Sequence, residues 1–464
     1  MFRKLFRTKP AHSSSHTDLH RCLNAFDLTL MGIGAIIGAG VFVLTGIAAA
    51  TKGGPAIVVS YVIAGFAAMF AALAYAELAS SIGGCGSAYS YAYTGFGEFL
   101  AWVIGWILIL EYAIASSTIS IGWSGYVANF LQAMNIHIPE YLLKNPFEGG
   151  FINLPAFLII CTLAIVLSLG TKQSSRFNAI IVFIKLFTIA LFIAVAAVNV
   201  NPANWHPFMP FGFSGVVSGA ALVFFAYIGF DALSTAVEET IEPQRNIPIG
   251  IIASLLICTA VYIVVSALLT GIAHYTTLNV ESPVANALLQ LGHNKVAGWI
   301  AAGAIAGLTT TVLVMYYGLT RICFAISRDG LLPAFFAKIN RRTHTPVPLI
   351  LTSGLVMALI AGFTPIDQGA KLVNIGTLAA FVFVCAGVIA ARITHPELHR
   401  PFKLPLNPLI PGLGVLFCGY LMLNLPAITW ISFLIWTAIG VVIYFCYGQR
   451  NSVLGKEIVN SSQT

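Results

Sequence analysis

The chain has 464 residues, of which 58% are hydrophobic and only 8% are charged, and its formal net charge is +7. A globular domain in water carries about 25% charged residues, so this composition excludes a soluble enzyme, a disordered chain and a fibrous protein. The mean hydropathy of +0.90 instead predicts an all-α integral membrane protein.

Twelve apolar segments are each long enough to cross a bilayer, which takes about 20 helical residues. They cover residues 26–50, 55–80, 97–127, 153–170, 177–198, 213–238, 247–272, 297–326, 347–363, 370–391, 408–425 and 428–447. We expect the polar segments 1–25 and 449–464 to be cytoplasmic tails. Residues 1–25 lack the apolar core and cleavage site of a secretory signal, so we expect the first apolar segment to be a span.

The basic residues between these segments are distributed asymmetrically. If both termini are cytoplasmic, eighteen of the 23 lysines and arginines lie inside and one, Lys185, lies within a span. The four on the outside are Lys52, Lys144, Lys295 and Lys371. This bias is typical of cytoplasmic loops and predicts a multi-pass protein with an even number of spans. It also assigns the positive charge to a rim that faces anionic lipid and not to a nucleic-acid-binding surface.

Sequence patterns that indicate enzymes or metal sites are not found. The eight cysteines lie mostly inside apolar runs without metal-ligand spacing, and we interpret them as free thiols. Residues 395–399 resemble a zinc-protease helix only superficially, because the residue order is wrong and Pro396 interrupts them. No serine or cysteine has a plausible base and no phosphate-binding loop occurs, so we expect no enzyme, no metal site and no cofactor.

The first apolar segment contains four glycines within nine residues, Gly32, Gly34, Gly38 and Gly40. Their spacing differs from that of a dinucleotide-binding loop, and no strand precedes them. Close helix packing through Gly34 and Gly38 is one interpretation. The other is that the helix unwinds near Gly38, Ala39 and Gly40, which is tolerated at membrane depth only where the backbone lines a cavity.

A second candidate break lies in the sixth segment, where Gly229 and Asp231 interrupt an apolar run. A charged residue at this depth has to face protein or water. Breaks in corresponding positions of two halves indicate the binding site of an inverted-repeat transporter. We therefore expect two repeats of five spans followed by two further spans: residues 26–198, 213–391 and 392–448.

The two breaks would free backbone groups of opposite polarity. Amide groups at the start of the outer half-helix attract a carboxylate, and freed carbonyls accept hydrogen bonds from an ammonium, so the pair suits a free L-amino acid. The expected amide donors are Gly38, Ala39, Gly40 and Val41. The expected carbonyl acceptors are Ile36, Phe225, Ala226 and Ile228.

Several stretches occur together in the order found in one known family of transporters: residues 26–28, 34–42, 54–56, 74–78, 224–235, 238–239, 245–248 and 327–333. In them the chain resembles the amino acid–polyamine–organocation (APC) superfamily, and most closely its cationic amino acid transporter subfamily, over residues 20–447. The resemblance implies a LeuT-type fold with a 5+5 inverted repeat, 12 transmembrane helices, and helices 1 and 6 unwound mid-membrane. It also implies a bacterial inner-membrane protein that binds its substrate between spans 1, 3, 6, 8 and 10. In this family Phe230 or its neighbours would close the site to the outside, and Ala39 stands where a hydroxyl residue is common.

Lys185 lies in the middle of the fifth segment without a polar neighbour. One interpretation is a structural lysine bound to backbone carbonyls. The family resemblance suggests instead that its ammonium takes the place of the sodium ion of sodium-coupled relatives, with span 1 carbonyls and the hydroxyls of Thr310 and Thr311 as partners. Because burial disfavours the charged form of an amine, Lys185 could bind and release a proton in each transport cycle.

Glu111, in the middle of the third segment, is a second candidate proton carrier. The alternative is a helix-packing partner of a hydroxyl such as that of Ser116 or Tyr112. Four glutamates near the expected cytoplasmic ends of spans 2 and 6 are interpreted as solvated or paired rim charges, with a gate that pairs with Arg21, Arg245 or Arg328 as the alternative. These glutamates are Glu77, Glu238, Glu239 and Glu242.

Together these patterns predict a secondary active transporter that carries L-amino acids by alternating access and uses the proton gradient as its energy source. Met315, Phe225 and Phe230 would make the pocket apolar and small, which favours small and medium neutral amino acids. Cationic amino acids are the alternative, and Asp231 could face them, although an acid beside a helix break is more often a local cap. An amino acid exchanger and an amino-acid-binding receptor without transport are the other functions considered. The expected partners are the amino acid, the proton and the lipid bilayer, while an accessory subunit and a homodimer stay open.

Overall fold

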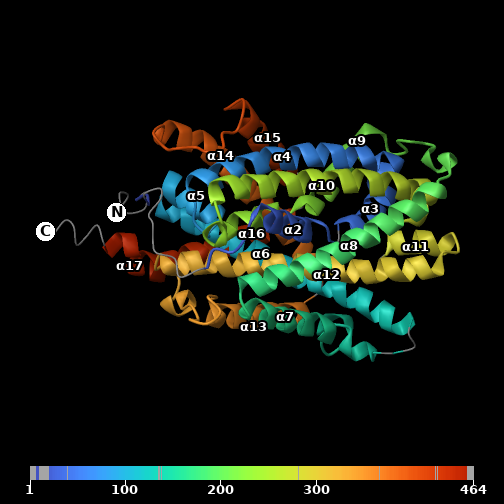
Figure 1. Cartoon of the computed structure of the whole chain (residues 1–464), viewed down its shortest axis with the longest axis horizontal. Coiled ribbons are helices and arrows are strands. Elements are labelled where there is room, and N and C mark those ends of the chain that lie inside the picture. The colour runs from blue at the N-terminus through green and yellow to red at the C-terminus, as the bar shows by residue number, and fades with distance from the viewer. Residues whose placement is uncertain are drawn as a thin grey trace.

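The computed structural model describes residues 7–9, 20–38, 40–133, 136, 138–280, 282–364, 366–423, 425 and 427–456. Within these ranges the regular structure is helical, apart from an isolated bridge between Leu23 and Thr240. Figure 1 shows the longer helices aligned along one axis in a bundle. The predicted all-α class is therefore confirmed.

The helices follow the apolar segments of the sequence. In chain order they are α2 (Ala25–Ile36), α3 (Thr45–Ala48), α4 (Ile57–Ser81), α5 (Ala88–Gly95), α6 (Glu98–Ala133), α7 (Leu154–Ser168), α8 (Thr171–Val198), α9 (Gly212–Val223), α10 (Pro243–Ile272), α11 (Pro283–Gln290), α12 (Asn294–Arg328), α13 (Val347–Phe363), α14 (Ile366–Thr394), α15 (Leu409–Leu423), α16 (Ala427–Ile443) and α17 (Gln449–Asn451). Polar residues set several of the starts. Asn24 and Asp27 form a capping box at α2, and the Asn153 side chain caps α7.

Eight helical runs in the described part of the chain are long and apolar enough to cross a membrane. The first two expected spans fall within one of them, Ala25–Ser81. Three more expected spans correspond to the shorter apolar helices α7, α13 and α15, of 15, 17 and 15 residues. Helix length and composition therefore support a multi-pass membrane protein, and the count of twelve spans stays a prediction.

Helices α6 and α12 lie near the centre of the bundle, whereas α8 and α16 lie at its surface. In the most apolar windows, 61% of α6 and 67% of α12 is buried, against 33% of α8 and 22% of the run that contains α16. The side chains of Phe183 and Phe187 on α8 are accordingly exposed. Such an apolar outer surface is expected of a protein whose surroundings are hydrocarbon.

The first and sixth apolar segments are each interrupted. Helix α2 ends at Ile36, and the chain becomes helical again in a π-helical turn, η1 (Gly40–Leu44), that leads through α3 into η2 (Ala49–Gly53). In the sixth segment α9 ends at Val223, and two 3-10 segments follow, η7 (Phe224–Tyr227) and η8 (Phe230–Glu239). Both interruptions lie at the positions that the glycines and Asp231 indicate.

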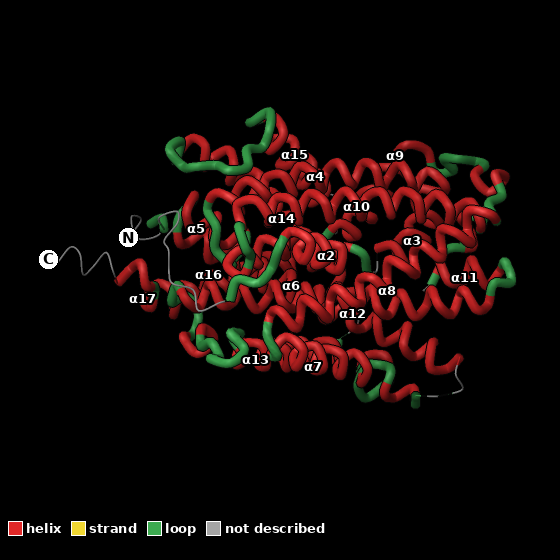
Figure 2. Tube along the Cα trace, in the orientation of Figure 1, coloured by secondary structure: helices red, strands yellow, loops and turns green. Residues whose placement is uncertain are grey.

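The two ends of the described chain meet at one buried carboxylate, that of Glu98 at the start of α6. Its oxygens lie 2.5 Å from Arg7 Nη2 and 2.5 Å from Ser452 Oγ. Figures 1 and 2 show α5 and α17 at the same end of the bundle. We call this end the chain-end side; its location in the cytoplasm stays a prediction.

Candidate functional site

The two helix breaks touch each other at two glycines. A Cβ atom on Gly40 would lie 2.3 Å from the Cβ of Ala226, so a larger residue would push the breaks apart. Gly229 has a φ of +124°, and a Cβ there would lie 2.9 Å from the Cβ of Ala35. Only glycine combines this backbone conformation with so close an approach.

Tyr262 of α10 joins the two breaks. Its hydroxyl lies 2.7 Å from the carbonyl oxygen of Ile36 and 2.8 Å from that of Ala226. A hydroxyl has one proton, so it satisfies these carbonyls in part and leaves acceptor capacity on both. The Phe225 carbonyl accepts from the Ile228 amide at 3.2 Å. The carbonyls of Ile36, Phe225 and Ala226 are thus already partly satisfied within the protein, and their expected role as acceptors for an ammonium stays a prediction.

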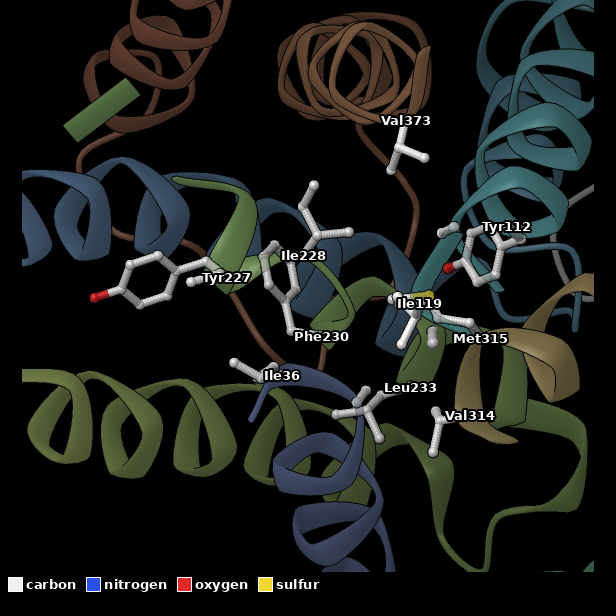
Figure 3. Packing of buried hydrophobic residues seen from close by; sticks show 14 of the residues in the cluster. Ile36, Tyr112, Ile119, Tyr227, Ile228, Phe230, Leu233, Val314, Met315 and Val373 are labelled. Carbon is white, nitrogen blue, oxygen red and sulfur yellow. The ribbon is translucent and has the colours of Figure 1, made fainter. Parts of the chain in front are cut away.

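A small cavity of about 20 Å³ lies between the breaks. Its lining residues come from α2, α6, α12, α14 and the two breaks, as Figure 3 shows for several of them: Ala35, Ile36, Gly38, Gly40, Ala115, Ile119, Phe225, Ala226, Ile228, Thr311, Met315 and Val373. The volume suffices for about one water molecule. The cavity has to widen before it can hold an amino acid.

Seven of the ten predicted substrate residues line this cavity. Val41 and Phe230 do not, and Ala39 lies outside the described residues. The fully buried ring of Phe230 packs instead against Tyr75 and Phe381, with ring centroids 5.8 and 5.1 Å apart. Phe230 is thus held in an aromatic cluster beside the cavity and forms no part of its wall.

Lys185 of α8 binds the C-terminal end of α2. Its ammonium lies 2.8 Å from the Ile37 carbonyl, 3.1 Å from that of Ile33 and 3.2 Å from that of Gly34. The fourth partner is the hydroxyl of Thr310 on α12, at 2.9 Å. The side chain is fully buried. A positive group is favourable here because the carbonyls at the end of a helix carry partial negative charge.

The two threonines predicted beside Lys185 differ in their contacts. Both hydroxyls donate to the carbonyls of Gly34 and Gly307, at 2.9–3.1 Å. Only Thr310 is also bonded to Lys185, while Thr311 lines the cavity. Thr310 and Lys185 therefore tie α2, α8 and α12 together at one point.

Glu111 lies on another side of the site. Its Oε1 accepts from the hydroxyl of Thr377 on α14 at 2.5 Å, and its buried Oε2 has no hydrogen-bond partner among the described residues. This contact agrees with the alternative of a helix-packing partner of a hydroxyl, but the hydroxyl belongs to Thr377, because Tyr112 donates to Asp231 and Ser116 to the Tyr112 carbonyl. Glu111 does not line the cavity.

Asp231 caps the second break locally. Its carboxylate accepts from the amide of Gly229 at 3.2 Å and from the hydroxyl of Tyr112 on α6. Asp231 does not line the cavity either. This arrangement agrees with the interpretation of a local cap.

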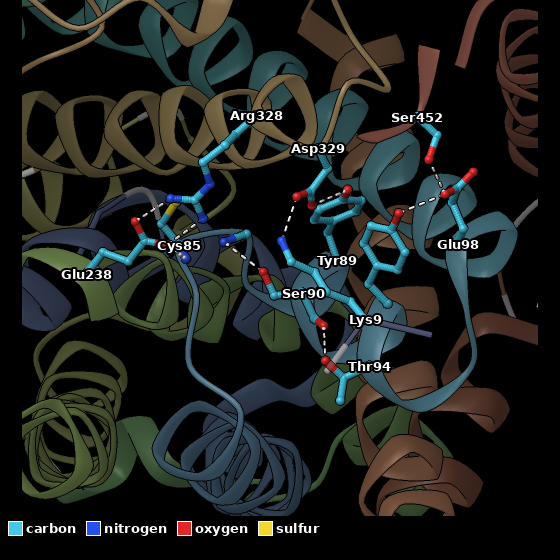
Figure 4. Close-up of polar contacts among 12 residues, drawn as sticks. Lys9, Cys85, Tyr89, Ser90, Thr94, Glu98, Glu238, Arg328, Asp329 and Ser452 are labelled. Atoms are coloured by element: carbon cyan, nitrogen blue, oxygen red, sulfur yellow. Dashed lines mark hydrogen bonds and ion pairs between the residues drawn. The ribbon is translucent and has the colours of Figure 1, made fainter. Parts of the chain in front are cut away.

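Ion pairs hold the chain-end side together (Figure 4). Glu238 pairs with Arg328 at 2.7 Å, as one form of the gate hypothesis expects. Glu239 pairs instead with the buried Arg321 at 2.7 Å, and Glu77 pairs with Arg392 at 2.5 Å. The sequence analysis did not identify Arg321 and Arg392 as partners. It assigned these arginines to the cytoplasmic rim, and a sequence does not show which residues meet across the bundle. These glutamates are fixed structural partners and not freely solvated charges.

Comparison with known proteins assigns this geometry to a family. The model of the amino acid permease family matches residues 23–449. The branched-chain amino acid permease of Bacillus subtilis (strain 168) is 51% identical over 451 residues, with 96% of this chain and 97% of the relative covered. The methylthioribose transporter of the same organism is 48% identical over 458 residues, with 97% and 99% covered. The vacuolar cationic amino acid transporter 4 of Arabidopsis thaliana is 38% identical over 387 residues, with 82% and 64% covered. The chain therefore belongs to the amino acid permease family of the APC superfamily, a family of membrane transporters and not of enzymes.

Proposed function

We propose that this permease carries neutral amino acids into the cell by alternating access and that a proton bound at Lys185 drives the transport. The observation that carries the proposal is the position of the Lys185 ammonium. It binds three carbonyls at the broken end of α2, and this end also forms the wall of the cavity. A change in the charge of Lys185 therefore acts directly on a helix that lines the site.

The coupling follows from the contacts of Lys185. A protonated ammonium holds the end of α2 against α8 and α12, because it donates to α2 carbonyls and to Thr310. A neutral amine has fewer hydrogens to donate and no charge to attract the carbonyls, so α2 is released. Loss of the proton towards the cytoplasm then favours the state in which α2 has moved and the substrate can leave.

The architecture that we propose is a LeuT-type bundle of twelve spans with both chain ends in the cytoplasm. Breaks in the first and sixth apolar segments, with contact between them, support two repeats of five spans. The outer apolar surface supports a place in the cell membrane. The basic residues of the sequence support the orientation.

The lining of the cavity favours a neutral side chain. Ile119, Ile228, Met315 and Val373 surround it, and none of the described residues that line it carries a charge. A buried guanidinium without a counter-charge is strongly unfavourable, and neither Glu111 nor Asp231 reaches the wall. One relative is named a branched-chain amino acid permease, which agrees with a leucine-like substrate. Methylthioribose is the second candidate, because a relative of similar identity is named for its transport.

The test is uptake into proteoliposomes that contain the full chain, with and without an inward proton gradient. Labelled leucine, alanine, arginine and methylthioribose are compared in the wild type, in Lys185→Ala, and in Lys172→Ala as a control at an exposed lysine of the same helix. We expect gradient-driven leucine uptake that falls more than about tenfold in Lys185→Ala and is unchanged in Lys172→Ala.

Other outcomes would reject parts of the proposal. Leucine uptake that ignores the gradient but needs internal leucine would identify an exchanger. Binding without uptake would identify a receptor. Uptake of arginine alone would overturn the inference that the apolar lining selects neutral side chains. Uptake of methylthioribose alone would overturn the proposal that the substrate is an amino acid.

A further inference from the structure

A groove of about 630 Å³ runs along the outer face of α10 on the chain-end side. It is lined by Gln244, Arg245, Pro248, Ile249, Ile252, Ala253 and Leu256 of α10 and by Pro401 and Phe402 of the loop between α14 and α15. The α10 residues recur every three or four positions and so form one helix face. From Arg245 to Leu256 this face extends about 16 Å.

The wall opposite α10 is held rigidly by a buried glutamate. Glu77 pairs with Arg392, lies 3.5 Å from Arg400 Nε and accepts from the amide of Leu404 at 2.7 Å. Arg400 also donates to the carbonyls of Ala391 and His395. The segment that presents Pro401 and Phe402 is therefore fixed on both sides, and the groove is preformed. Figure 2 shows this loop at the same end of the bundle as α5 and α17.

The end of the groove nearest the chain-end side is polar and cationic. The side chain of Arg245 is exposed and makes no hydrogen bond or ion pair among the described residues. Lys403, also exposed, follows Phe402 in the opposite wall. Arg245 lines both the groove and the neighbouring cavity on the chain-end side, whereas Glu242 lines that cavity only. The groove thus has a positive end and an apolar floor.

The length of α10 places these parts at defined depths in a membrane. Its 30 residues span about 45 Å, close to the full thickness of a bilayer with its headgroups. Arg245, in the first turn, then lies at the level of the headgroups, and Ile249 to Leu256 lie in the hydrocarbon layer. A basic pocket at this level with an apolar groove below it suits the headgroup and one chain of an anionic lipid.

We propose that this groove is a binding site for an anionic phospholipid, whose phosphate contacts Arg245 and whose acyl chain lies along α10. The charge of Arg245 favours this occupant over a second copy of the chain, because a copy would bring its own arginine to a symmetric contact. The site lies on the outer surface of α10 and does not depend on the transported substrate.

Lipid binding to the purified full chain in a neutral detergent tests the site, with native mass spectrometry as the readout. Phosphatidylglycerol, phosphatidylcholine and inorganic phosphate are the probes. We expect the wild type to retain one phosphatidylglycerol about tenfold more tightly than phosphatidylcholine, and we expect Arg245→Gln to remove this difference, since a charge-assisted hydrogen bond is lost. Ile252→Trp fills the apolar floor and should weaken both lipids.

Matched controls are Arg341→Gln, at another exposed arginine, and Leu359→Trp, at an exposed apolar position of α13. Both should bind phosphatidylglycerol like the wild type. Equal binding of the two lipids, unchanged binding in Arg245→Gln, or occupancy by phosphate as tight as by the lipid would overturn the proposal. A change of oligomeric state in Ile252→Trp with unchanged lipid binding would show that the groove is a contact between copies and would also overturn it.

Discussion

The two helix breaks use ionisable groups of opposite sign. At the first break, the negative end of α2 meets the ammonium of Lys185. At the second, the start of η8 meets the carboxylate of Asp231, which accepts from the Gly229 amide. Each group opposes the partial charge of its helix end. A broken helix inside a membrane protein is therefore stabilised by a side-chain charge opposite in sign to the partial charge that its own backbone exposes.

The breaks differ in where this charge comes from. Asp231 lies two residues from Gly229, so the second break carries its own cap. Lys185 lies 148 residues from Ile37 and on a different helix, so the cap of the first break can separate from it. In the proposed mechanism, this difference makes α2 the element whose position depends on a proton and makes the second break a fixed reference.

The largest effect is expected from Lys185→Met, which removes the cap of the first break. Three carbonyls and the Thr310 hydroxyl lose a partner, and an unpaired buried polar group costs about 1–3 kcal/mol. We expect the free energy of unfolding in detergent to fall by about 3 kcal/mol or more, as measured by thermal unfolding. Lys172→Met is the control. An unchanged unfolding midpoint would mean that Lys185 does not hold α2.

Asp231→Ala should have the next largest effect, about 2 kcal/mol, because it leaves the Gly229 amide and the Tyr112 hydroxyl without an acceptor. Asp231→Asn keeps an acceptor oxygen and should cost less. Because this cap is local, we expect Asp231→Asn to keep the dependence of uptake on the proton gradient. Loss of that dependence, as expected for Lys185→Ala, would remove the distinction between the two breaks.

Tyr262→Phe tests the link between the breaks. It removes one hydroxyl that serves the carbonyls of Ile36 and Ala226, and the expected loss of stability is about 1–2 kcal/mol. Because the Tyr262 hydroxyl joins two walls of the cavity, we also expect the apparent affinity for leucine to fall. Leucine uptake measured over a series of leucine concentrations gives this affinity. Tyr316→Phe, at another buried tyrosine with a carbonyl partner, is the control. Equal losses of affinity in both variants would contradict a specific role for Tyr262.

The smallest and sharpest difference is expected between Thr310→Val and Thr311→Val. Both remove a hydroxyl that donates to Gly34 and Gly307, so both should lose about 1 kcal/mol of stability. Only Thr310 contacts Lys185. Thr310→Val should therefore shift the pH dependence of uptake, whereas Thr311→Val should leave it unchanged. The same shift in both variants would show that contact with Lys185 is not what matters.

Much of the fold and part of the site could be predicted from residue types along the chain. Glycines and an aspartate inside apolar runs indicate both breaks, because neither belongs in a lipid-facing helix interior without a reason. Tyr262 and Arg321 could not be identified in this way. A tyrosine in an apolar run and an arginine near a helix end are common, and only their partners show what they do.

The sequence by itself determined the membrane class, the approximate helices and the places where two of them are interrupted, because hydropathy and backbone freedom are local properties. The tertiary structure decided which groups meet: Lys185 with Ile33 and Ile37, Thr377 with Glu111, and an arginine with each of three glutamates. It also decided that Phe230 lies beside the cavity and outside its wall, and that the cavity is nearly closed. These contacts join residues on different helices, and their geometry depends on how the whole bundle packs.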